Sequence, residues 1–135
     1  MDISEPIQVL RGLVQDNAIQ PACWRAFEEF CRRHRIEGFV FFQYRKLGYD
    51  LPPDLTTRWR HVLFEQGRQN RMKLDCLEKI KKEIVVPWIL LKGPHVALQY
   101  YDGLQKRHLG DLDLLVAPSD ICSAEAGLQR LGLRR

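Results

Sequence analysis

Residues Gly110 to Val116 read Gly-Asp-Leu-Asp-Leu-Leu-Val, and this stretch decides how the C-terminal part of the chain folds. Its apolar residues are typical of a short buried strand, and Ala117-Pro118 ends it. On a strand, Asp111 and Asp113 point to the same face, about 6–7 Å apart along the backbone, while Leu112 and Leu114 point into a core. We therefore expect two carboxylates side by side on one face of a buried strand.

Two neighbouring carboxylates repel each other and lose hydration, so a compensating positive charge is expected beside Asp111 and Asp113. Aspartate oxygens suit Mg²⁺, which keeps several waters and takes its remaining ligands from substrate phosphates. The same Asp-x-Asp pattern also marks solvated strand edges and turns, and taken alone it more often does. The preceding glycine and the following apolar run favour the metal site here.

A second strand is expected upstream, because residues 85–91 form a short, apolar, β-branched run that ends at a Lys92-Gly93 turn. A helix is expected over residues 94–101. Backbone N–H groups in such a turn can approach a phosphate. Lys92 and Arg107 add two cations that suit a triphosphate, although each alone is more often a surface charge.

The first 84 residues are expected to form successive helices. Ser4 is a candidate N-cap of the first, Pro21 opens the second, and the longest runs from about residue 52 to 84. The apolar segment 39–44 fits either a strand or a buried helix, and its helical neighbours favour a helix. A last helix is expected from a Ser119 cap to a stop at Gly132.

The amino-acid composition excludes several classes of protein. Hydrophobic residues make up 45% of the 135 residues and charged residues 28%, which excludes a disordered chain. The 21 basic and 17 acidic residues give a net charge of +4, which permits an anionic partner without requiring one. No apolar run is long enough to span a membrane, and the acidic start is not a signal peptide. A cytoplasmic protein without a membrane partner is therefore expected.

The four cysteines contain no Cys-x-x-Cys pair, and the four histidines are scattered singly, so a zinc site is not expected. We expect buried or half-buried free thiols in a reducing compartment.

A family resemblance rests on three stretches: Trp88–Leu98, Tyr100-Tyr101 and Arg107–Val116. Together they resemble the bacterial nucleotidyltransferase family of the DNA polymerase β-like superfamily. More narrowly, they resemble its uncharacterised branch, in which a Leu-Lys-Gly turn precedes an Arg-x-x-x-Asp-x-Asp-Leu-Leu-Val strand. The ending, Leu128–Arg134, is similar to that branch's next helix. The motif-bearing resemblance covers Val86–Arg134.

The resemblance implies an α+β fold, in which a helical segment (residues 1–84) precedes the first strands and helices of a nucleotidyltransferase-type mixed sheet (85–135). It implies transfer of a nucleoside monophosphate from a nucleoside triphosphate to an acceptor hydroxyl. Asp111 and Asp113 match the catalytic carboxylates that bind Mg²⁺ or Mn²⁺. Gly93 matches the glycine turn that contacts phosphates. Lys92 and Arg107 match recurrent basic positions of the branch, where we infer phosphate binding.

Two departures from the family pattern bear on activity. The turn is Gly93-Pro94 where the superfamily usually has Gly-Ser or Gly-Gly, and proline lacks one N–H. The superfamily also takes a third carboxylate from a later strand, whereas only Asp120 and Glu125 follow Asp113, both on the expected last helix. A two-stranded sheet is too small to be stable alone. We therefore expect the N-terminal portion of a longer protein, weakly active or inactive as it stands, or a sheet completed by another chain.

Two other hypotheses compete with an enzyme. The first is a helical interaction module that carries a degenerate nucleotidyltransferase remnant, for which core packing of each aromatic is the commoner alternative. The aromatic residues concerned are Trp24, Phe27, Phe39, Phe41, Phe42 and Trp59. The second is nucleic-acid binding by the basic long helix, although its interspersed acidic residues favour a solvated face. The acceptor stays open among protein, peptide, RNA and small-molecule hydroxyls.

Overall fold

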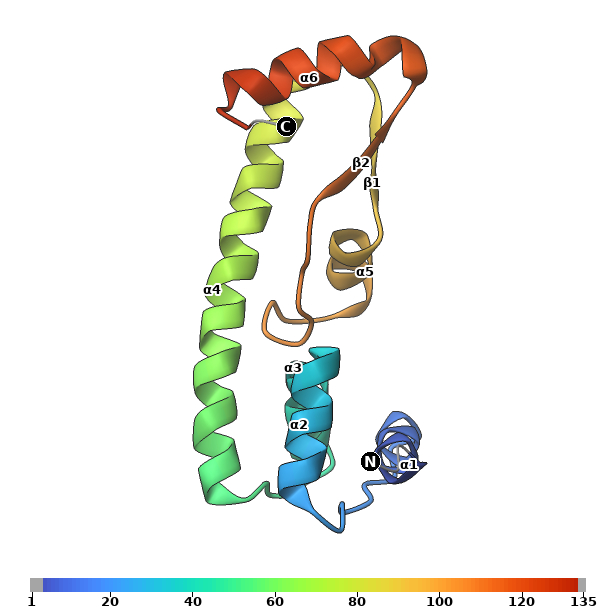
Figure 1. Ribbon diagram of the computed structural model, residues 1–135, viewed down its shortest axis with the longest axis vertical. Coiled ribbons are helices and arrows are strands. Elements are labelled where there is room, and N and C mark those ends of the chain that lie inside the picture. The colour runs from blue at the N-terminus through green and yellow to red at the C-terminus, as the bar shows by residue number, and fades with distance from the viewer. Residues whose placement is uncertain (1–3, 134–135) are drawn as a thin grey trace. The chain divides into compact units, whose positions relative to one another are not determined.

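The computed structural model describes residues 4–133 and confirms an α+β fold, with mostly helices and a small antiparallel sheet (Figure 1). The helices that precede the sheet are α1 (Ser4–Val14), α2 (Trp24–His34), α3 (Glu37–Lys46) and α4 (Pro53–Glu83). The elements that follow are β1 (Trp88–Leu91), α5 (Gly93–Tyr100), β2 (Asp113–Val116), a 3₁₀ turn (Pro118–Asp120) and α6 (Ile121–Arg130). Arg134 and Arg135, and with them the last residue of the family-like ending, lie outside the described residues.

The chain forms two compact units. The first comprises the residues up to Gly67 together with Gln105–His108, and the second comprises Arg68–Leu104 together with the residues from Leu109 onward. The predicted division at residue 84 concerns the extent of a nucleotidyltransferase core, and it stays a prediction.

The first unit is built around one apolar core shared by α1, α2, α3 and the start of α4. Its buried members are Val9, Leu13, Phe27, Cys31, Val40, Phe41, Tyr44, Leu51, Leu55, Trp59 and Leu63. Residues 39–44 lie within α3, so the helix favoured for this segment is confirmed. All six aromatic residues of the interaction-module hypothesis either belong to this core or pack against it. Core packing therefore accounts for them.

The segment Gln105–His108 joins the first unit through polar and aromatic contacts. Gln66 donates from Nε2 to the Gln105 carbonyl at 2.6 Å. Lys106 Nζ lies 5.2 Å from the centre of the Phe42 ring, and an Arg35 nitrogen lies 2.8 Å from His108 Nε2. These contacts hold a segment that is far in sequence from the rest of the first unit.

The second unit is organised by the alternation of side chains on its two strands. β1 and β2 run antiparallel, with Trp88 opposite Val116 and Leu91 opposite Asp113. One face of the sheet packs on the end of α4 and on α6. The residues of this second core are Cys76, Ile80, Ile84, Val86, Trp88, Leu112, Leu114, Val116, Ala124, Leu128 and Leu131. The expectation that Leu112 and Leu114 point into a core is confirmed.

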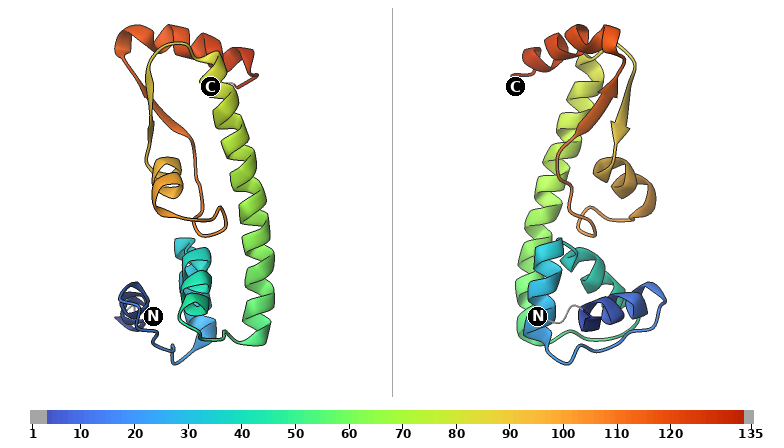
Figure 2. Two further views of the ribbon diagram at one scale, coloured as in Figure 1. Left: turned by 180° about the vertical axis from the view of Figure 1, so that it is seen from behind. Right: turned by 45° about the vertical axis from the view of Figure 1, so that its right-hand side comes forward.

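The other face of the sheet is open. Ile89 and Leu115 lie opposite each other on it and are 61% and 52% exposed. Within this unit, α6 lies across one end of the sheet and α5 follows β1 at the other end, as both views of Figure 2 show. Leu91 and Asp113, the last pair of the register, therefore lie at the α5 end.

The starts of α2 and α6 depart from the sequence-based expectations, and α5 lies one residue earlier than expected, at Gly93–Tyr100. α2 begins at Trp24 rather than at Pro21. Ser119 does not cap α6, because it lies in the 3₁₀ turn and Asp120 precedes the helix. The stop at Gly132 is confirmed: its φ of +76° is a left-handed conformation that favours glycine, and the following N–H of Leu133 bonds back to the Leu128 carbonyl at 3.1 Å.

The cysteines are free, as expected, but their burial differs. Cys31 is buried and Cys76 half-buried, whereas Cys23 and Cys122 are exposed, so the expectation of buried or half-buried thiols is wrong for these two. None of the helices in residues 4–133 combines the length and apolar character that crossing a membrane requires.

Candidate phosphate and metal site

The turn between β1 and α5 is made by a single residue, Lys92. Its backbone has φ 56° and ψ −126°, a conformation that residues with a side chain rarely adopt. Holding such a residue costs about 1–3 kcal/mol. α5 starts at the next residue, where the buried Pro94 suits the first turn because it has no N–H to satisfy. The strained backbone makes a sharp elbow from strand to helix.

Asp113 lies across the sheet from this elbow. It is the first residue of β2 and pairs with Leu91 in the register, which brings its side chain to the adjacent Lys92. Lys92 Nζ lies 3.1 Å from Asp113 Oδ2, and the two side chains are 74% and 42% exposed. An ion pair this exposed is worth at most about 1 kcal/mol. A ligand can therefore reach both groups and separate them at little cost.

Asp111 is placed differently from the expectation. β2 begins at Asp113, so Asp111 precedes the strand and is exposed. The expectation of two carboxylates on one buried strand is wrong. The physical reason is the cost of removing two like charges from water, which is avoided when one lies before the strand and the other is only half-buried.

The two carboxylates fit a divalent cation by their donor chemistry. Mg²⁺ is commonly bound through one or two carboxylates, with waters and substrate phosphates supplying its other ligands. Asp111 and Asp113 offer such oxygens on an accessible surface. Among residues 4–133, no three His, Cys, Asp or Glu side chains gather in a way that would enclose an ion.

Gly93 follows Lys92 and begins α5. A Cβ atom at this position would meet no other atom within 4 Å, so the backbone of the elbow is open to an approaching group. The first N–H groups of a helix have no partner within the helix, which makes its N-terminus favourable for anions. Lys92, Gly93 and Asp113 thus come together in one unit. Arg107 is half-buried and lies in Gln105–His108, within the first unit, so its role at phosphates stays a prediction.

Asn70 on α4 was not identified from the sequence, and Lys73 was considered only among the basic residues of the long helix for nucleic-acid binding. Asn70 is 1% exposed, donates from Nδ2 to the Leu104 carbonyl at 2.6 Å and accepts from the Leu109 N–H at 3.2 Å. Lys73 Nζ donates to the Leu109 carbonyl. The available signal was spacing. On α4, Asn70 lies midway between the buried Leu63 and Leu77, seven residues from each, at a position where an apolar residue is expected.

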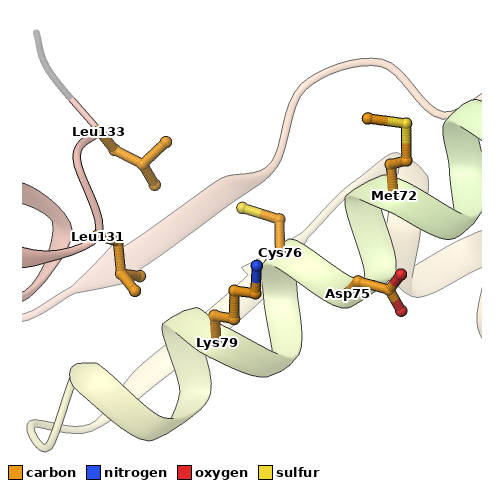
Figure 3. Close-up of a pocket in the computed structure, with 6 residues that line it drawn as sticks. All are labelled: Met72, Asp75, Cys76, Lys79, Leu131 and Leu133. Carbon is orange, nitrogen blue, oxygen red and sulfur yellow. The ribbon is translucent and has the colours of Figure 1, made fainter.

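A pocket of about 280 Å³ lies elsewhere in the second unit. Its lining residues are Met72, Asp75, Cys76, Lys79, Leu131 and Leu133. Figure 3 shows the thiol of Cys76 directed toward the two leucines, while Asp75 turns its carboxylate away from them. None of the residues expected at the phosphate and metal site lines this pocket.

A comparison with protein families matches residues 20–135 to a family described as uncharacterised nucleotidyltransferase. Neither the curated proteins nor the solved structures contain a match to this chain.

Proposed function

The chain belongs to the family of uncharacterised nucleotidyltransferases, and we propose that it moves a nucleoside monophosphate from a nucleoside triphosphate to an acceptor hydroxyl. The acceptor oxygen forms a bond to the α-phosphorus, and the bond from that phosphorus to the bridging oxygen breaks. Pyrophosphate leaves with the electron pair, and the hydroxyl proton passes to solvent. Residues 85–135 form the nucleotidyltransferase core in this proposal.

The pairing of Lys92 with Asp113 is the observation that carries the proposal. It places a cation and a carboxylate together, exposed, at the start of a helix. Asp111 and Asp113 are the metal ligands, and bound Mg²⁺ or Mn²⁺ supplies positive charge against the triphosphate. Gly93 offers its backbone to a phosphate.

In this proposal Lys92 binds first Asp113 and then a phosphate of the nucleotide. In the ligand-free chain its ammonium neutralises Asp113. When the carboxylate is engaged elsewhere, the flexible lysine stem can redirect the same charge to a phosphate oxygen.

The test is calorimetric titration of the 135-residue chain with ATP, GTP, CTP and UTP, with and without Mg²⁺. We expect metal-dependent binding of at least one nucleotide, weakened about tenfold or more when Asp111→Asn and Asp113→Asn are combined, since charge-assisted contacts are each worth about 1.5–3 kcal/mol. Asp75→Asn is the matched control, because Asp75 is an exposed carboxylate on α4. We expect this control to bind like the unaltered chain.

Binding that is unchanged in the double variant would exclude Asp111 and Asp113 as the site. No binding of any of the four nucleotides would remove the proposed reaction and favour the interaction-module hypothesis. Where binding is seen, release of pyrophosphate on addition of candidate hydroxyl compounds tests the transfer itself.

A further inference from the structure

Leu109 is buried, and two side chains of α4 bind its backbone. Its N–H donates to Asn70 Oδ1 at 3.2 Å, its carbonyl accepts from Lys73 Nζ, and its side chain is 1% exposed. Asp111 follows two residues later, before β2 begins at Asp113. The chain that leads into the two carboxylates therefore starts from a fixed point.

Asn70 also closes the loop that precedes this point. Its Nδ2 donates to the Leu104 carbonyl at 2.6 Å, so one side-chain amide bridges both ends of the segment 104–109. Because Asn70 is 1% exposed, removing either bond leaves a buried polar group unsatisfied.

An apolar residue would be the simpler choice for packing at this position. Leu63 and Leu77, seven residues before and after Asn70 on α4, are both buried leucines. A buried amide is favourable only where its hydrogen bonds are made, and here two of them go to the backbone at the two ends of one loop. The structure thus uses a core position of α4 to hold a loop.

We propose that Asn70 is a positioning residue for nucleotidyl transfer, which with Lys73 fixes Leu109 and thereby sets where Asp111 and Asp113 present their carboxylates. The inference rests on the proposed function, because the carboxylates gain their role from it. Gly110 is the one residue between the fixed Leu109 and Asp111, and a Cβ there would meet nothing within 4 Å. Because only Gly110 separates Leu109 from Asp111, the two hydrogen bonds that hold Leu109 constrain where Asp111 lies.

The experiment uses Asn70→Leu, Asn70→Asp and Lys73→Met in the full chain, with Arg71→Ala as the exposed control on the same helix. Amide hydrogen exchange at residues 109–113, measured without ligand, reports whether Asn70 and Lys73 still hold Leu109. Binding of Mn²⁺ together with the preferred nucleotide, measured by electron paramagnetic resonance, reports the affinity of the site at Asp111 and Asp113. Circular dichroism and exchange in α4 and β1 report whether each variant is folded.

We expect Asn70→Leu to speed exchange at Leu109 and to weaken Mn²⁺–nucleotide binding, each by about tenfold, since a lost hydrogen bond to a buried group costs about 1–3 kcal/mol. Asn70→Asp keeps the acceptor for the Leu109 N–H and should retain slow exchange there with intermediate binding. Lys73→Met should weaken binding while the helix stays folded. This variant decides the question if Asn70→Leu does not fold.

Two other outcomes are distinguishable. If the unaltered chain binds and the folded Asn70 and Lys73 variants bind equally well despite faster exchange at Leu109, the positioning role is wrong and the proposed function stands. If the unaltered chain binds no Mn²⁺–nucleotide at all, the proposed function fails and the positioning role fails with it.

Discussion

Lys92 Nζ lies 3.1 Å from Asp113 Oδ2, so a residue expected to bind phosphate and a residue expected to bind metal are each other's partners in the ligand-free chain. The antiparallel register brings them together by pairing Leu91 with Asp113. In the proposed reaction both groups must change partner. Lys92 therefore competes with the metal for Asp113, and Asp113 competes with phosphate for Lys92. The direction in which removal of either side chain changes ligand binding can be predicted.

Lys92→Met should affect metal and nucleotide binding in opposite directions. Removing the ammonium frees Asp113, so Mn²⁺ without nucleotide should bind about two- to fivefold more tightly, the scale of an exposed ion pair. Nucleotide binding in the presence of Mg²⁺ should weaken by about tenfold, because a charged contact to phosphate is lost. Paramagnetic resonance and calorimetry measure the two quantities, with Lys82→Met as the exposed control. A fall in both affinities would contradict the exchange of partners.

Lys92→Gly should make the protein more stable than Lys92→Ala does. The φ of 56° at this position strains any residue with a Cβ, and only glycine relieves the strain. We expect a difference of about 1–2 kcal/mol in the free energy of unfolding between the two variants. Urea denaturation measures it. Equal stability of the two variants would show that the elbow is unstrained in solution.

Gly38→Ala should loosen the attachment of Gln105 to the first unit. A Cβ at Gly38 would lie 2.2 Å from the Gln105 carbonyl oxygen, far inside van der Waals contact. The loop must move, at a cost of about 1–3 kcal/mol, and the bond from Gln66 to the same carbonyl should break. Thermal unfolding measures the loss. Gly110→Ala is the control, because its Cβ meets open space, and a similar loss there would refute the steric explanation.

Glu37 should make stability depend on pH. Burial raises the pKa of this carboxyl in the folded protein, against the lowering effects of its own backbone and of Arg32. The folded state therefore holds the proton more tightly than the unfolded state does. The resulting stability is complete below the ordinary glutamate pKa and is lost as pH rises through the raised value. Glu37→Gln should stabilise the protein at neutral pH and change little near pH 4, as urea titrations at both pH values would reveal.

The four thiols should react with iodoacetamide in order of exposure. Cys23 and Cys122 are exposed and should be modified first, followed by the half-buried Cys76. Cys31 is 0% exposed and burial raises its pKa, so little reactive thiolate forms there. We expect it to react only when urea unfolds the chain. Mass spectrometry follows the order, and early modification of Cys31 would show that the first core opens readily.

Local patterns in the sequence predicted most elements, because their causes are local. The apolar period of α4 and the glycine stop after α6 need only neighbouring residues to be recognised. The ambiguous segment 39–44 was resolved as a helix through its helical neighbours. Ser119 shows the limit of this approach, because whether a serine caps a helix depends on the backbone of one turn.

The site was less predictable, because its contacts join residues distant in sequence. The pairing of Lys92 with Asp113 needs the register of the sheet, and the bonds from Asn70 span more than thirty residues. The sequence therefore indicated candidate residues for the site but not the contacts between them. Asp111 was expected on the strand for the same reason. β2 begins at Asp113 because Asp113 pairs with Leu91, and this pairing cannot be recognised from neighbouring residues alone.

The long connection between the two strands has an evolutionary consequence. β1 and β2 are joined by residues 92–112 rather than by a tight hairpin turn, so turn geometry does not set their register. An insertion between Tyr101 and Leu104 would lengthen the connection and leave Leu109 in place. A single residue inserted between Asp113 and Leu114 lies within β2 and would turn one side of the strand to the opposite face. Length variation should therefore accumulate between Tyr101 and Leu104 and be eliminated within β2.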